Sequence, residues 1–284
     1  MSRSNVGGAG LALFFLIAVF PVAASLVYAF LYTVGATGLL SRGLTSSSWK
    51  SVLTSTEILG SFAISFWVAS VSVASATAGG LAIALFLRRQ LSRGPLSLAI
   101  HLPLALPWLV AGFVGFQVLA PVGVLSRLFA RTGLIGSMSA FPRLTHDTFF
   151  LGVILVHVFL ALPFFTLLFN QLINSERIDD YVALSKTLGA SSGQTFRRVV
   201  APILLTKART NILLLFVVVL GSYEIPLLLG RQHPSMISVL TVRKYYRFDL
   251  TQKPQAFAIA ILYTFVAVAV IVLALRGRTP EVSK

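Results

Sequence analysis

Six apolar segments dominate this sequence, and each is long enough, or nearly so, to cross a lipid bilayer. They are residues 10–34, 57–87, 98–121, 148–170, 209–229 and 256–275. A helix needs about 20 apolar residues to cross the hydrocarbon core. Backbone groups find no water there, so a chain of this kind must satisfy them within its own helices. The sequence therefore predicts an all-α, polytopic membrane protein with six transmembrane helices.

Composition and charge fit this class and exclude several others. Only 11% of residues are charged and 56% are hydrophobic, whereas soluble domains carry about 25% charged residues. The net charge of +15 comes from short basic clusters between the apolar segments, which indicates contact with membrane lipid and no nucleic-acid partner. The absence of cysteine excludes thiolate metal sites, and no His, Asp and Glu set has metal-ligand spacing. No metal, cofactor or catalytic residue is predicted.

Two of the segments carry further information about packing. Pro103, Pro107 and Pro121 interrupt the segment 98–121, which predicts an irregular span packed inside protein. Small residues are dense in the segment 57–87, and they let helices approach closely. We expect this second span to pack centrally.

A polar stretch near residues 180–202, DYVALSKTLGASSGQTFRRVVAP, is too patterned for a plain linker. Tyr181, Leu184 and Leu188 stand at helical spacing, which predicts a short amphipathic helix. Gly189 suits the end of that helix, because glycine adopts positive φ without a Cβ clash.

A second helix is expected after the glycine. Phe196, Val199 and Val200 give it an apolar side, and Pro202 precedes the next span. On periodicity alone, the stretch is a helical hairpin at the membrane surface.

The hairpin resembles the cytoplasmic loop motif of binding-protein-dependent ABC permeases. That motif is Glu-Ala-Ala, three residues, Gly, nine residues, Ile, one residue, Leu-Pro. Here nine residues follow Gly189 before Val199, so the spacing from glycine to Pro202 fits, and Ala190 completes the family's Leu-Gly-Ala. Ala183 stands where the family has its glutamate, and Ala201 replaces the usual leucine.

The resemblance implies a mechanism and a set of partners. Residues 171–208 would form a coupling loop that docks on one of two separate ATP-binding cassette subunits. The loop residues that carry the resemblance are Tyr181, Ala183, Leu184, Leu188, Gly189, Ala190, Phe196, Val199 and Pro202. A second permease subunit, identical or homologous, and an extracytoplasmic substrate-binding protein would complete the importer. No phosphate-binding loop G-x-x-x-x-G-K-[ST] occurs in the chain, so we expect it to be no enzyme.

The resemblance also implies a domain organisation and an orientation in the membrane. Residues 1–56 hold the first transmembrane helix and an outer loop, 57–275 the permease core, and 276–284 a tail. Both termini would be cytoplasmic and the protein would lie in the cell inner membrane. The tight cluster of Arg88, Arg89 and Arg93 favours the same orientation.

The sequence alone leaves several substrates possible. GSYEIPLLLG and the Leu-Pro-rich third span look most similar to spermidine/putrescine permeases. Permeases for thiamine, ferric iron, sulfate or molybdate are alternatives. A rival class is an ion-coupled secondary transporter, which needs ionisable residues in its spans. The predicted spans offer only Glu224 and His157 as such residues.

Four residues are candidates for the substrate pathway. Glu224, with Tyr223 beside it, could contact a cationic substrate or act as a gate, or it could sit at the interface or pair with an arginine. His157 could bind substrate or make a helix–helix hydrogen bond, and Gln117 could line the pathway. The basic patch 243–247 could dock an acidic binding protein or be a solvated, lipid-facing loop.

Overall fold

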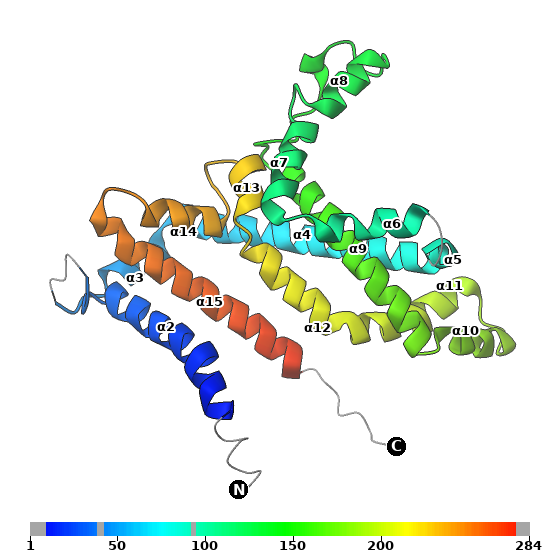
Figure 1. Cartoon of the computed structure of the whole chain (residues 1–284), viewed down its shortest axis with the longest axis horizontal. Coiled ribbons are helices and arrows are strands. Elements are labelled where there is room, and N and C mark those ends of the chain that lie inside the picture. Colours follow the sequence, from blue (N-terminus) through cyan, green and yellow to red (C-terminus); the bar gives the residue numbers. More distant parts are fainter. Residues whose placement is uncertain (1–9, 39–42, 92–94, 277–284) are drawn as a thin grey trace, which may run out of the picture. The chain divides into compact units, whose positions relative to one another are not determined.

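The computed structural model describes residues 10–38, 43–91 and 95–276, and the regular structure in this part of the chain is entirely helical (Figure 1). Six helical stretches of the described chain are long and apolar enough to cross a membrane: Gly10–Thr33, Thr56–Phe86, Trp108–Arg131, Leu151–Ser175, Ser192–Leu220 and Leu250–Leu273. This confirms the predicted fold class. The tail predicted at 276–284 lies, beyond Arg276, outside the described residues.

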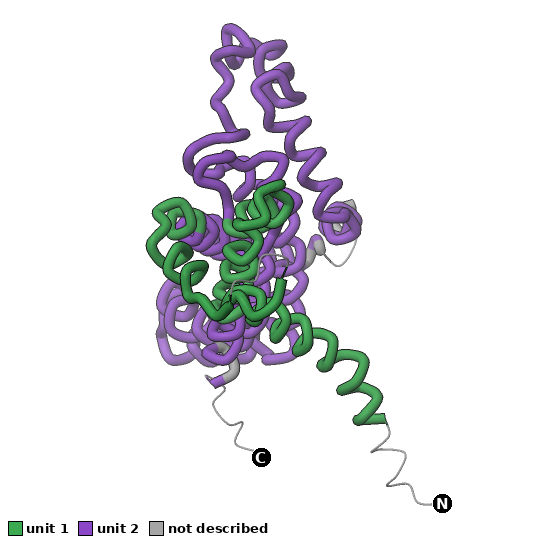
Figure 2. Tube along the Cα trace, turned by 90° about the vertical axis from the view of Figure 1, so that its left-hand side faces the viewer, with its two compact units in different colours: residues 1–61, 237–266 green, residues 62–236, 267–284 purple. Residues whose placement is uncertain are grey.

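The chain divides into two compact units, residues 1–61 with 237–266 and residues 62–236 with 267–284 (Figure 2). The first unit contains η1 (Phe15–Val19), α2 (Phe20–Thr33), α3 (Ser47–Thr54), α14 (Ile237–Tyr245), η5 (Leu250–Gln252) and the start of α15 (Lys253–Arg276). The second contains most of α4 (Thr56–Phe86), then α5 (Arg88–Leu91), α6 (Pro95–His101), η2 (Pro103–Ala105), α7 (Trp108–Leu119), α8 (Val124–Arg131) and η3 (Met138–Ala140). It continues with α9 (Leu151–Ser175), α10 (Ile178–Thr187), α11 (Ser192–Thr195), η4 (Phe196–Val200), α12 (Ala201–Leu220) and α13 (Glu224–Leu229).

Helix α9 is the centre of the second unit. It packs against α7, α12 and α13, and against α10 at its C-terminal end. Phe165 and Phe169 on α9 are fully buried, with their rings 6.2 Å apart. Gly80 of α4 shows how closely helices approach here, since a Cβ at this position would lie 2.6 Å from the Phe165 Cβ. The small residues of α4 thus allow the close packing that the sequence predicts.

The third span is irregular, as predicted, but it begins later than the segment 98–121 suggested. Helix α6 ends at His101, the short η2 follows, and α7 starts only at Trp108. Leu106 is extended, with ψ 124°, because the residue before a proline is disfavoured in the α region. The proline at 107 therefore sets the true start of the helix.

The predicted fifth span, 209–229, is wrong at both ends. The helix extends back through α12 to Ser192 and includes Lys207, which pairs with Glu176 at 3.1 Å. Hydropathy excludes this charged turn from the predicted span, although the helix continues through it. At its other end the helix stops at Leu220, so Glu224 opens a separate helix, α13.

In the first unit, aromatic rings join α2, α14 and α15. The Phe257 ring lies 4.9 Å from that of Tyr32 and 5.7 Å from that of Tyr245, measured between centroids. Trp49 of α3 donates its indole N–H to the Thr33 hydroxyl at 3.0 Å. These contacts hold the start of α15 beside α2 and α14.

Candidate functional site

The first candidate site is a helix–turn–helix at residues 178–200, formed by α10, α11 and η4, which we call the hairpin. Asp179 and Asp180 lie in the first turn of α10 and Lys186 in its last, which matches the helix dipole. Gly189 adopts φ +78°, and the Ala190 N–H closes the turn on the Ser185 carbonyl at 3.0 Å. The predicted helix, positive-φ glycine and second helix are all present.

A capping box fixes the start of the second helix. The Ser191 hydroxyl accepts from the Gln194 N–H at 3.3 Å, and the Gln194 side-chain oxygen accepts from the Ser191 N–H at 2.9 Å. The Ser-x-x-Gln spacing is a local sequence signal for this cap, separate from the apolar periodicity of the two helices. Together, the cap and the glycine turn give the hairpin a defined shape.

Apolar side chains stand exposed on the hairpin. Tyr181, Leu184 and Leu188 share one face of α10 and are 47%, 59% and 79% exposed, and Phe196 is 41% exposed. Ala183 and Pro202 are also exposed, whereas Val200 is buried. Charged and polar residues surround these side chains, so the hairpin presents an apolar strip of the kind that partner proteins cover.

Two ion pairs connect the hairpin region to the membrane helices. The Arg88 guanidinium, at the start of α5, lies 2.6 Å from the Asp179 carboxylate. Lys207 of α12 lies 3.1 Å from Glu176, which follows the last residue of α9. The first pair thus joins the hairpin to α5, and the second joins the end of α9 to α12.

His157 lies at the break between α12 and α13. Its side chain is buried, Nδ1 is 2.8 Å from the Val153 carbonyl oxygen, and Nε2 is 3.0 Å from the Ser222 hydroxyl. A carbonyl only accepts, so Nδ1 carries the proton and Nε2 accepts from Ser222. The Trp108 ring, 5.6 Å away, packs edge-on against the imidazole. His157 thus makes a hydrogen bond from α9 to the α12–α13 break.

Tyr223 and Glu224 follow Ser222 directly and are half-buried. Among the described residues, Glu224 has no ion pair or side-chain hydrogen bond. The break therefore brings three of the four pathway candidates into one neighbourhood. A cavity of about 170 Å³ beside His157 is lined mostly by apolar residues of η2, α7, α9 and α12.

Gln117 lies elsewhere, in a cavity of about 500 Å³ after the end of α7. We call it the α7–α8 cavity; its lining is Phe116, Gln117, Ala120, Pro121, Val122, Gly123, Arg127, Arg143, Thr145 and His146. The structure does not bring Gln117 to the break with the other three candidates.

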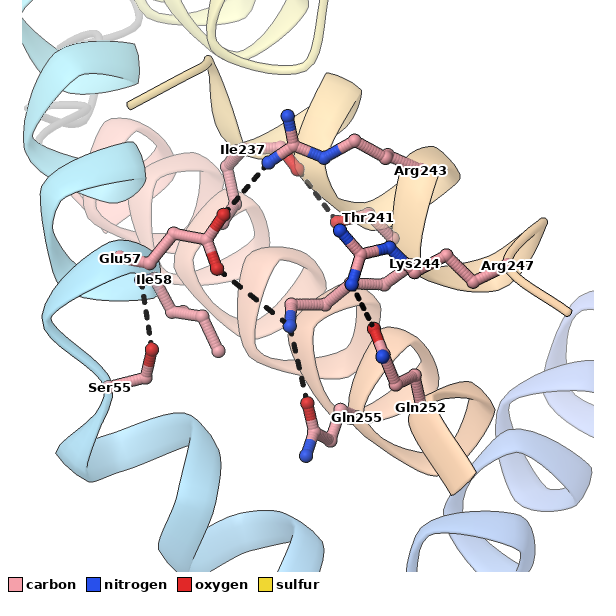
Figure 3. Close-up of polar contacts among 10 residues, drawn as sticks. All are labelled: Ser55, Glu57, Ile58, Ile237, Thr241, Arg243, Lys244, Arg247, Gln252 and Gln255. Carbon is pink, nitrogen blue, oxygen red and sulfur yellow. Dashed lines mark hydrogen bonds and ion pairs between the residues drawn. The ribbon is translucent and has the colours of Figure 1, made fainter. Parts of the chain in front are cut away.

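The basic patch 243–247 makes contacts inside the first unit (Figure 3). Arg243 donates to the Glu57 carboxylate at 2.8 Å, and Lys244 lies 3.9 Å from its other oxygen. Lys244 also donates to the side-chain oxygen of Gln255 at 3.3 Å. These bases join α4, α14 and α15, so much of the patch is engaged within the unit.

Comparisons with known proteins agree on one family. The family described as "Binding-protein-dependent transport system inner membrane component" matches residues 76–278. The molybdenum transport system permease protein ModB of Mycobacterium tuberculosis is 28% identical over 203 residues, 71% of this chain and 72% of that protein. The sulfate transport system permease protein CysT of Salmonella typhimurium is 26% identical over 222 residues, 76% of each.

A solved structure has the same fold. It is a bacterial ABC transporter involved in the import of the acidic polysaccharide alginate, with a TM-score of 0.71 and 18% identity. The match covers 96% of this chain and 95% of that one. The fold of this chain is therefore one found in a bacterial ABC transporter.

Proposed function

Since the chain belongs to the family of inner membrane components of binding-protein-dependent transport systems, and is thus an ABC importer permease, we propose that it carries a tetrahedral oxyanion. The observation that carries this proposal is its similarity, over 71% and 76% of its length, to permeases named for molybdenum and for sulfate. Both were alternatives that the sequence left open. The two ions share charge and shape, so one pathway can suit either.

We propose that the hairpin contacts the ATP-binding subunit. That subunit would hydrolyse the ATP that drives transport. The hairpin's exposed apolar strip and the ion pair between Asp179 and Arg88 support this role. Helix α9 has 25 residues and so extends about 37 Å from the hairpin towards the α13 region. A push on the hairpin would then move α9 and α12, and with them the bond between His157 and Ser222.

This assignment sets an orientation. With the hairpin cytoplasmic, the C-terminal end of α4 is cytoplasmic too, because Arg88 pairs with Asp179 of the hairpin. The start of α9, the end of α7 and the α7–α8 cavity then face the outside. With six crossings, both termini would then lie in the cytoplasm, in agreement with the positive-inside rule.

Uptake by the complete importer tests the substrate. The chain would be reconstituted in proteoliposomes with its ATPase subunits, its partner permease and its binding protein, and labelled sulfate and molybdate would be offered. We expect ATP-dependent uptake of at least one oxyanion, with no competition from spermidine. Uptake of spermidine with no oxyanion uptake would contradict the proposal.

A polyamine remains the second candidate, and it rests on Glu224, an acid without a partner among the described residues. Glu224→Gln keeps the shape and removes the charge. A polyamine importer should lose at least about tenfold in uptake, the equivalent of about 1.4 kcal/mol, whereas an oxyanion importer should keep its activity. The same variant thus separates the two substrates.

A further inference from the structure

The α7–α8 cavity gathers basic groups that the coupling mechanism does not use. Arg127 of α8 and Arg143 and His146 of the following loop all line it, and none of its described lining residues is acidic. The nearest acid in sequence, Asp147, is engaged, because its carboxylate accepts the N–H groups of Phe149 and Leu151 at 2.9 Å each. The charged side chains among the described lining residues are therefore all basic.

The walls of the pocket are fixed by hydrogen bonds. Arg127 donates its Nε–H to the Val122 carbonyl at 3.0 Å, which orients the guanidinium. His146 donates its backbone N–H to the Leu229 carbonyl at 2.8 Å, and its Nδ1 lies 2.9 Å from the Gly230 carbonyl oxygen. Nδ1 must donate to that carbonyl, so Nε2 is left for another partner. Groups held in this way lose little freedom when they bind a ligand.

The pocket suits a small oxyanion in size and chemistry. Its volume of about 500 Å³ exceeds many times the ~30 Å³ that a water occupies in the liquid, so an oxyanion fits with part of its hydration shell. Guanidinium groups bind oxyanions with paired, charge-assisted hydrogen bonds. Gln117 adds an amide whose N–H groups can donate to the same ligand.

We propose that the α7–α8 cavity is an oxyanion-binding vestibule, held by Arg127 and Arg143, that receives the anion at the outer end of the pathway. The loop residues of the cavity come directly before the N-terminus of α9, and the hairpin follows its C-terminus. The vestibule thus lies at the opposite end of α9 from the hairpin. The proposal rests on the function proposed above for its substrate class and its outward orientation.

Cysteine labelling tests the vestibule without relying on transport. The chain has no cysteine, so Gln117→Cys places the chain's one thiol in the cavity, in a complete importer whose other subunits lack cysteine. The probes are an anionic and a cationic methanethiosulfonate, and a neutral maleimide confirms that the site is intact. The ratio of the anionic to the cationic rate reports the local charge.

The matched control is Arg131, one turn further along α8 and outside the cavity lining. Arg127→Gln or Arg143→Gln should lower the rate ratio about fourfold, since one unit charge about 10 Å away changes each rate about twofold, in opposite directions, in watery surroundings. Arg131→Gln should change it far less. Equal effects of all three variants would overturn the proposal.

Protection of the Gln117→Cys thiol from labelling identifies the ligand. Sulfate or molybdate, without binding protein, should slow labelling more than chloride at the same ionic strength, and only while both arginines are present. Protection that appears only with the binding protein would mean that the cavity docks that protein's carboxylates, and this would overturn the proposal. Oxyanion uptake with no protection refutes the vestibule alone, whereas protection without uptake supports the vestibule and refutes the proposed function.

Discussion

The glycine turn of the hairpin allows a sharp test of coupling. Gly189 has φ +78°, and a Cβ added there would meet nothing within 4 Å. Gly189→Ala therefore creates no clash with the surroundings, and its cost is that of the left-handed backbone, about 1–2 kcal/mol for an L-residue. That cost shifts the population of the turn by a factor of about 5–30.

Three substitutions set the scale of the effect. Gly189→Val should be worse than Gly189→Ala, because a β-branched residue at positive φ is a stronger outlier. Gly189→Asn should retain most function, since asparagine tolerates this region. Gly193→Ala is the control: this glycine is also on the hairpin and also faces open space, but it has no positive φ.

The assay measures ATP hydrolysis and substrate uptake in the same proteoliposomes. We expect Gly189→Val to insert normally but to raise the ATP hydrolysed per substrate moved at least several-fold. Asparagine at this position should restore the ratio nearly to that of the unaltered protein. The reasoning is refuted if Gly189→Val keeps that ratio, or if Gly193→Ala raises it equally.

Other contacts give further tests. Gly80→Ala should lower the melting temperature of the solubilised importer, because its Cβ would stand 2.6–3.0 Å from atoms of α9, backbone included; an unchanged melting curve would deny this close packing. Ser222→Ala should cost about 1 kcal/mol of stability by removing the bond to His157, and its combination with His157→Phe should cost less than the sum of the two, as a double-mutant cycle would show. Glu57→Gln should cost at most about 1 kcal/mol and less at high salt, since its pair with Arg243 is partly exposed, and a larger, salt-independent loss in thermal unfolding would contradict this.

The sequence predicts the six helices well because the bilayer enforces them. Lipid offers no hydrogen bonds, so any long apolar segment must be helical, and hydropathy alone finds it. Helix ends are harder, because hydropathy places the charged turn around Lys207 outside the span although the helix continues through it. The partner of Lys207, Glu176, comes from a distant segment, and the periodicity of the sequence does not indicate such a contact.

The two candidate sites also differ in how far the sequence alone predicts them. The hairpin is local, and Gly189 and its flanking helices could be read from consecutive residues. The α7–α8 cavity joins the end of α7 to a loop some 25 residues later, so Arg127 and Arg143 have no spacing that marks them as neighbours. His146 reaches the cavity through bonds to the end of α13, at Leu229 and Gly230. Only tertiary packing brings these groups together.

The signs of the charges along the second unit bear on the substrate. Glu224, in the first turn of α13, is the feature that favours a cation, and it has no ion pair or side-chain hydrogen bond among the described residues. The α7–α8 cavity has the opposite character, since its lining includes two arginines and no acidic residue among those described. As a vestibule at the outer end of the pathway, the proposed site for this cavity, it would repel a polyamine and attract sulfate or molybdate, in line with the proposed substrate.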